Sequence, residues 1–144
     1  MPKTNHTFNN AIAEFFSRTE IFVTRVECDE FAAHKFGDPV CPVPLQGASS
    51  YTVRAGPDKI VQFREPGSTL DEKTLALARE THPDVVACYE IHGFVGGSSE
   101  DAGEAKALCV YTMNNLPGTN YIMVRAELAE SLPLHLATVR SLAR

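Results

Sequence analysis

The sequence predicts an α+β fold, in which a five-stranded antiparallel sheet carries one packed helix and is flanked by N-terminal and C-terminal helices. Apolar residues recur at helical spacing near the start, in the middle and near the end of the chain. Short apolar runs bounded by turn residues lie between these segments. The predicted order of elements is helices, three strands, a helix, two strands and a last helix. This order favours an antiparallel sheet with helices mainly on one face.

The N-terminal part of the chain is predicted to contain two helices. Residues 8–16 carry a stripe of apolar side chains at helical spacing, which should dock on another element. Residues 26–36 show a second stripe, and Gly37 follows as a left-handed cap. The pair Asp38 and Pro39 then ends the helical pattern.

Five strands are predicted between residues 40 and 114. The turn residues 55–58 join the second strand to the third. The polar, glycine-rich residues 96–105 join the last two strands, and we expect them to form a mobile hairpin tip. The five predicted strands cover residues 40–45, 51–54, 60–65, 85–94 and 107–114.

A helix over residues 68–80 is predicted between the third and fourth strands. Ser68 and Asp71 have the spacing of a capping box at its start. After the sheet, residues 121–124 form a short extended piece and residues 126–142 a last amphipathic helix. The side chains of the 68–80 helix that we expect to face the sheet are Leu70, Leu75, Leu77 and Ala78.

Length and composition are those of one domain spanning residues 1–144. With 144 residues and 44% hydrophobic content, the chain can bury about two thirds of its unfolded surface in a single core. Within this domain we distinguish N-terminal helices in residues 1–37, a sheet with its helix in residues 38–118, and a C-terminal helix in residues 119–144.

Charge and hydropathy argue against two classes of partner. The net charge of −5 leaves no excess of positive charge to neutralise the phosphates of a nucleic acid. The apolar runs fall short of the roughly 18 residues that cross a bilayer, and the first ten residues are too polar for a signal peptide. We therefore expect a cytoplasmic protein that binds neither nucleic acid nor membranes.

The cysteines do not have the spacing of a metal site. They stand too far apart for a CxxC knuckle or a dense disulfide framework. We expect them to be small buried apolar residues, and we expect no metal and no other cofactor. The four cysteines are Cys28, Cys41, Cys88 and Cys109.

Two motifs carry a resemblance to a known family. They are CPVPLQGASSYTVRAGPDKIVQFRE at residues 41–65 and LCVYTMNNLPG at residues 108–118, with the predicted helix between them. From about residue 27 to residue 118 the chain resembles the N-terminal lobe of fungal aminoglycoside phosphotransferase-like (choline-kinase-like) proteins. The resemblance implies a protein-kinase N-lobe-like sheet whose first turn covers nucleotide phosphates, whose third strand carries a basic residue paired with an acid on the helix, and whose fifth strand runs into an adenine-binding hinge.

The resemblance assigns roles to particular positions of this chain. It maps the phosphate turn to residues 46–50, the basic residue to Arg64, its acidic partner to Glu72 or less well to Glu80, and the hinge to residues 113–115. Enzymes of this family place a catalytic aspartate in H-x-D-x-x-x-x-N and a metal-binding aspartate in D-x-G or D-x-D, both in a second lobe. The sequence shows neither motif at a corresponding position, so we expect that the chain is not a kinase on its own.

One tripeptide imitates the catalytic motif. His82, Pro83 and Asp84 have the form H-x-D, but Tyr89 stands where the motif needs asparagine. The tripeptide also follows the predicted 68–80 helix directly instead of lying in a second lobe. We therefore interpret it as a helix terminus.

The third and fifth predicted strands carry the candidate site residues. Period-two alternation puts Gln62 and Arg64 on one face of the third strand. Two interpretations stay open: a polar solvated face with Arg64 in an ion pair to Glu72, or a pair of donors to a carbonyl or carboxylate of a bound molecule. The candidate catalytic residues are Gln62, Arg64 and Tyr111. The candidate substrate-binding residues are Tyr51, Glu72, Met113 and Asn114.

Two functions are compatible with this pattern. The first is a non-phosphorylating small-molecule enzyme of fungal secondary metabolism, an isomerase or an intramolecular cyclase, including the pericyclic Diels–Alder type. It would fold its substrate and polarise a carbonyl by hydrogen bonding. The alternative is a nucleotide-binding or scaffolding pseudokinase-like module without catalytic activity. The expected partners are a small-molecule substrate and a second copy of the chain, which could pair through the exposed lobe face.

Overall fold

The computed structural model describes residues 4–18, 21–84, 86–96 and 107–117, together with several positions between residues 130 and 140. Three predicted features fall mainly or wholly outside the described residues. They are the loop at 96–105, the extended piece at 121–124 and the last helix at 126–142.

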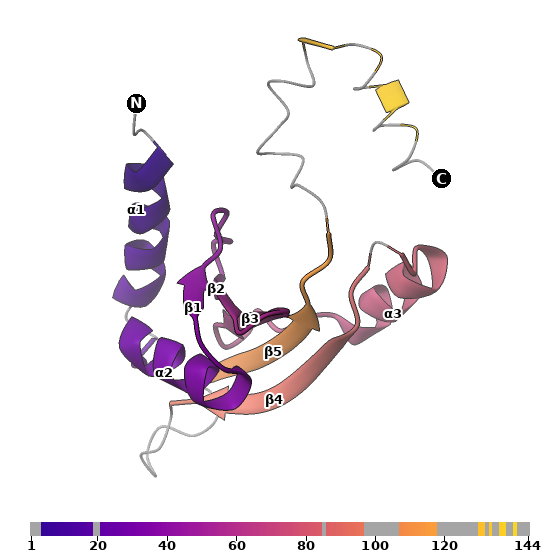
Figure 1. Cartoon of the computed structure of the whole chain (residues 1–144). Helices are drawn as coiled ribbons and strands as arrows, with labels where there is room; N and C mark the ends of the chain where they lie inside the picture. The colour runs from indigo at the N-terminus through magenta and orange to yellow at the C-terminus, as the bar shows by residue number, and fades with distance from the viewer. Residues whose placement is uncertain are drawn as a thin grey trace.

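The predicted α+β fold with a five-stranded antiparallel sheet is confirmed (Figure 1). The strand order is β1-β2-β3-β5-β4, and every neighbouring pair is antiparallel. The described elements are, in chain order, α1 (Thr4–Ser17), α2 (Arg25–Phe36), β1 (Val40–Pro42), β2 (Ser50–Ala55), β3 (Lys59–Arg64), α3 (Glu72–Thr81), β4 (Tyr89–Val95) and β5 (Leu108–Asn114).

The two faces of the sheet meet different helices. Helices α1 and α2 contact the strands on one face, which we call the core face, and α3 lies on the other side of the sheet (Figure 1). Strand alternation sends Val61 and Phe63 to the core face, and both are fully buried. We call the opposite face, which carries Ile60, Gln62 and Arg64, the second face. The core cluster also contains Ile12, Phe15, Cys28, Ala32, Tyr51, Val53, Leu108 and Val110.

Helix α2 is fixed at both ends by local hydrogen bonds. Thr24 and Glu27 form a capping box at its start, with each side chain accepting from the other's backbone N–H. The Glu27 carboxylate accepts hydrogen bonds from the backbone N–H and from the hydroxyl of Thr24, and both lower its pKa. Gly37 donates its N–H to the Ala33 carbonyl at the other end. Its φ of +99° is positive as predicted, but its ψ of 165° is extended rather than left-handed helical.

Helix α3 begins later than the sequence predicts. Its N-cap is Asp71, whose carboxylate accepts from the backbone N–H groups of Lys73 and Thr74, so Ser68 does not cap the helix. The Ser68 carbonyl instead accepts from the Arg64 side chain, which keeps this part of the chain outside the helix.

The predicted sheet-facing stripe of α3 is only partly correct. Leu70, Leu75 and Ala78 are half-buried, whereas Leu77 is 64% exposed, so its assignment to the sheet side is wrong. Helix α3 has no fully buried residue, because only one edge of it meets the second face of the sheet.

Two of the four cysteines depart from the prediction. Cys28 and Cys109 are buried as expected, but Cys41 and Cys88 are exposed. Cys41 lies on β1, which is an edge strand, and Cys88 precedes β4, which is the other edge. Neither residue belongs to the buried core cluster, so both thiols are open to solvent.

The burial of the two faces can be tested by comparing Phe63→Ala with Leu77→Ala. Phe63 is fully buried among core residues, so its truncation should lower the free energy of unfolding by about 3 to 5 kcal/mol. Leu77→Ala removes an exposed side chain and should change that free energy by less than about 0.5 kcal/mol. Urea denaturation measures both values. A loss for Leu77→Ala as large as that for Phe63→Ala would contradict the described placement of α3.

Candidate functional site

The three candidate catalytic residues lie together on the second face of the sheet. In the β3–β5 pairing, Gln62 stands opposite Tyr111, and Arg64 stands opposite Cys109. Met113, a candidate substrate-binding residue, stands opposite Ile60 on the same face. The register of β3 and β5 together with strand alternation therefore brings Gln62, Arg64, Tyr111 and Met113 to one surface.

Arg64 is engaged in hydrogen bonds within the protein. Its Nε donates to the Ser68 carbonyl, and its Nη1 donates to Gln62 Oε1 at 3.1 Å. Gln62 in turn donates from Nε2 to Thr52 Oγ1 at 3.4 Å. The predicted ion pair between Arg64 and Glu72 is wrong, since no such pair occurs between these two described residues. The ion pair does not form because residues 65–71 run past Arg64 and place the Ser68 carbonyl where it accepts a hydrogen bond from the guanidinium.

Residues 65–71, which we call the 65–71 segment, also cover Tyr111. The Tyr111 hydroxyl accepts from the backbone N–H of Leu70 at 3.3 Å, and its side chain is only 2% exposed. Burial raises the pKa of the Tyr111 phenol, and its hydrogen bond with the Cys109 side chain raises it further. Tyr111 is therefore a neutral, covered hydroxyl rather than the wall of an open pocket.

The 65–71 segment is anchored at its start as well. Glu65 donates its backbone N–H to the Ser49 carbonyl at 3.2 Å, and its carboxylate forms an ion pair with Arg18 at the end of α1. The Ser68 hydroxyl donates to Glu65 at 3.4 Å. These contacts fix the start of the segment, while those of Arg64 and Tyr111 hold it against the second face.

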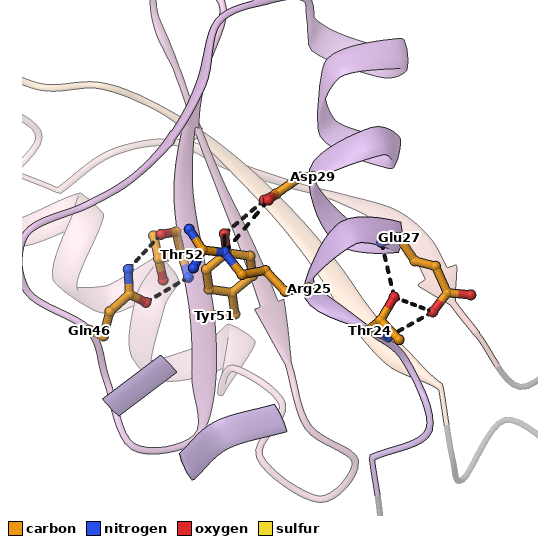
Figure 2. A network of polar contacts seen from close by, with 7 residues as sticks. All are labelled: Thr24, Arg25, Glu27, Asp29, Gln46, Tyr51 and Thr52. Atoms are coloured by element: carbon orange, nitrogen blue, oxygen red, sulfur yellow. Dashed lines mark hydrogen bonds and ion pairs between the residues drawn. The ribbon is translucent and has the colours of Figure 1, made fainter. Parts of the chain in front are cut away.

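Tyr51 lies on the core face and not beside Gln62, so its predicted place in the site is wrong. It pairs with Phe63 across β2 and β3, and its side chain is fully buried. Its hydroxyl donates to Asp29 Oδ1 at 2.7 Å and accepts from Arg25 Nε at 3.2 Å (Figure 2). Burial, followed by the neighbouring Asp29, raises the pKa of Tyr51. Tyr51 thus ties α2 to the sheet.

In the turn that the resemblance assigns to phosphate binding, residues 46–50, the Gln46 side chain is hydrogen-bonded to the protein backbone. The Gln46 Oε1 accepts from the Thr52 backbone N–H at 2.9 Å, and its Nε2 donates to the Thr52 carbonyl at 2.8 Å (Figure 2). The same Nε2 also donates to the Val43 carbonyl at 3.0 Å. The Gln46 amide therefore continues the hydrogen bonding of the sheet where β1 ends. This use of Gln46 explains why β1 stops at Pro42 and not at the predicted residue 45.

A groove of about 400 Å³ lies between α3 and the second face. We call it the α3 groove. Two candidate substrate-binding residues, Met113 and Asn114, are among its lining residues, whereas Gln62, Arg64 and Tyr111 are not. Its complete lining is Ile60, Leu70, Leu75, Val86, Ala87, Tyr89, Met113, Asn114 and Leu116.

Some lining residues could be found from the sequence and others could not. Ile60 stands two residues before Gln62 on the same strand, so strand alternation places both side chains on the second face. Leu75 belongs to the apolar stripe of the predicted helix. Val86 and Ala87 fall within the predicted strand 85–94, but β4 begins only at Tyr89, so that prediction is wrong for these two residues and they lie in the irregular connection between α3 and β4. Their position depends on where that connection crosses the sheet.

The rim of the α3 groove carries polar and charged groups. Asn114 Oδ1 accepts from Lys59 Nζ at 2.9 Å. Glu72, predicted to bind substrate, is exposed on the first turn of α3 and does not line the groove. Burial, together with the carboxylates of Glu72 and Asp71, raises the pKa of Tyr89, a lining residue. Negative charge therefore lies on the α3 side of the groove.

No family model, curated protein or solved structure matches this chain. Within the part of the chain that the structure describes, no three histidine, cysteine or acidic side chains are arranged to hold a metal ion. No helix in the same part combines the length and the apolar character needed to cross a membrane.

The structural role of Arg64 can be tested with Arg64→Ala. The substitution removes the donor of the Ser68 carbonyl and should lower the free energy of unfolding by about 1 to 3 kcal/mol. Arg79→Ala, on the exposed surface of α3, is the matched control and should cost less than about 0.5 kcal/mol. Thermal and urea denaturation measure the difference. An Arg64→Ala protein as stable as the control would show that these hydrogen bonds do not hold the 65–71 segment.

Proposed function

We propose that this domain binds a small molecule in the α3 groove, and that a flat ring such as a nucleotide base is the ligand class. One observation carries the proposal. The α3 groove lies where β5 ends, at Met113 and Asn114, which is where the resemblance to kinase-like proteins places the adenine-binding hinge. The proposal corresponds to a nucleotide-binding module without catalytic activity.

The chemistry of the lining supports a ring as the ligand. Aliphatic and thioether side chains come from the sheet at Ile60 and Met113 and from the α3 side at Leu70 and Leu75. Ligand sites are mostly apolar clefts in which a few polar groups fix orientation. Asn114 supplies such a group here, with its carbonyl oxygen held by Lys59.

Kinship with kinase-like proteins is part of the same proposal. It is supported by the two sequence motifs and by the chain order of three strands, a helix and two strands in one antiparallel sheet. Within this kinship Arg64 keeps the position of the basic residue on the third strand, although its guanidinium serves the 65–71 segment.

The contacts of the candidate catalytic residues favour binding over catalysis. Arg64 donates to Gln62 and to the Ser68 carbonyl, and Gln62 donates to Thr52. Tyr111 is covered by the 65–71 segment. A group that polarises a substrate carbonyl must have a free donor within hydrogen-bonding distance of it. The hydrogen bonds already made by Gln62 and Arg64 fix their donors within the protein, and Tyr111 is out of reach of a substrate while the 65–71 segment covers it.

The second candidate function is the isomerase or cyclase of fungal secondary metabolism. The apolar lining of the α3 groove favours it, since such a lining suits a carbon-rich substrate as well as a base. Gln62 and Tyr111 also lie two residues along their strands from the lining residues Ile60 and Met113. A substrate in the groove would be near these donors, and release of the 65–71 segment would expose them.

Thermal shift measurements with adenosine and with ATP and Mg²⁺ test the proposed function. A ligand at about 100 times its dissociation constant stabilises the folded state by about 2.7 kcal/mol, so the melting temperature of the wild type should rise. Ala87→Trp should abolish the rise, because Ala87 lines the groove and the larger side chain fills it. Ala76→Trp, on the exposed surface of α3, should behave as the wild type does.

Two results of these thermal shift measurements would contradict the proposed function. Unchanged melting temperatures for all three proteins would contradict a nucleotide module and favour the isomerase or cyclase. An equal rise for Ala87→Trp and the wild type would place the nucleotide outside the α3 groove and contradict the proposal.

A further inference from the structure

An arginine of β2 stands next to the α3 groove. In β2, Arg54 is the one exposed residue, since the other five are buried. Its Cα partner on β3 is Ile60, which lines the groove. Thr52 contacts Gln62, so its side chain lies on the second face. Arg54 stands two residues after Thr52 on β2 and therefore lies on the same face. The Arg54 side chain therefore projects from the second face on the β2 side of the groove.

The charge of Arg54 is not used inside the described part of the protein. Its side chain makes no hydrogen bond or ion pair with any other described residue. The other cations of the sheet are engaged: Lys59 donates to Asn114, and Arg64 donates to Ser68. An arginine that projects from an otherwise buried strand and has no partner among the described residues is available to an anion.

Charges of opposite sign lie on the two sides of the α3 groove. Asp71 and Glu72 lie at the start of α3, on the side of Tyr89, and their charge contributes to its raised pKa. Arg54 lies on the opposite side, beyond Ile60. An anionic ligand group is repelled by the first side and attracted by the second, so the bound molecule has a defined orientation.

We propose that Arg54 is a specificity-determining residue of the α3 groove and holds an anionic group of the ligand, whose ring lies in the groove. The ligand class is thus an apolar ring bearing a carboxylate, sulfonate or phosphate. This proposal rests on the proposed function only in using the same groove. It differs from the phosphate site implied by the resemblance, which lies at residues 46–50 and Arg64, where the side chains of Gln46 and Arg64 are already hydrogen-bonded.

Two fluorescent dyes that differ in one group provide the test. 8-Anilinonaphthalene-1-sulfonate carries a sulfonate, and N-phenyl-1-naphthylamine has the same rings without it. Both are titrated into the wild type, Arg54→Gln and Arg79→Gln. Arg79 is an exposed arginine on α3 and serves as the control for the loss of one positive charge. Circular dichroism melting verifies that each variant is folded.

We expect Arg54→Gln to weaken binding of the sulfonated dye about fivefold, as the loss of a charge-assisted contact at a partly solvated site should. Binding of the neutral dye should stay unchanged, and Arg79→Gln should leave both affinities as in the wild type. The effect should shrink as the ionic strength is raised. Ala87→Trp should weaken both dyes, because it fills the groove.

Three results would overturn the proposal. The first is an unchanged affinity of Arg54→Gln for the sulfonated dye. The second is an equal loss in Arg79→Gln, which would reduce the effect to net charge. The third is failure of the neutral dye to bind the wild type, or equal binding by Ala87→Trp, which would remove the groove as a site. A missing nucleotide shift together with the expected dye results would contradict the nucleotide ligand and leave the role of Arg54 standing.

Discussion

The pairing of β3 with β5 at the centre of the sheet determines the rest of the structure. Each strand alternates between two faces, so this register decides which side chains meet α1 and α2 and which meet α3. Val61 and Phe63 are buried on the core face, and Ile60 on the other face lines the α3 groove. A shift of one residue would exchange the two sets and remove both the core and the groove.

The second face is divided into a covered part and an open groove. Arg64 and Tyr111 hold the 65–71 segment through Ser68 and Leu70, so the polar side chains at that end of β3 serve the packing of this segment. Toward the other end of β3, α3 stands away from the strands and leaves the groove above Ile60. The same face thus contributes to stability at one end and offers space for a ligand at the other.

Strand alternation made much of the fold predictable, including the shared face of Gln62 and Arg64 and the order of the elements. The alternation also contained the signal that Tyr51 belongs to the core face, since Tyr51, Val53 and Ala55 are apolar and buried on one side of β2. Strand alternation could not predict the hydrogen-bonding partner of Arg64, for which the sequence offered an ion pair to Glu72. That partner depended on the path of the 65–71 segment, and backbone carbonyls such as that of Ser68 leave no pattern in a sequence.

Methyl-resolved NMR during titration with N-phenyl-1-naphthylamine tests the central claim most directly, because it locates a bound apolar ring on one face of the sheet. Chemical shifts of the Ile60, Leu75 and Met113 methyl groups should move in proportion to occupancy, since these side chains line the α3 groove. The methyl groups of Val61 and Val110, buried on the core face, should stay where they are. Movement of the core-face methyl groups without movement of the groove set would contradict the account.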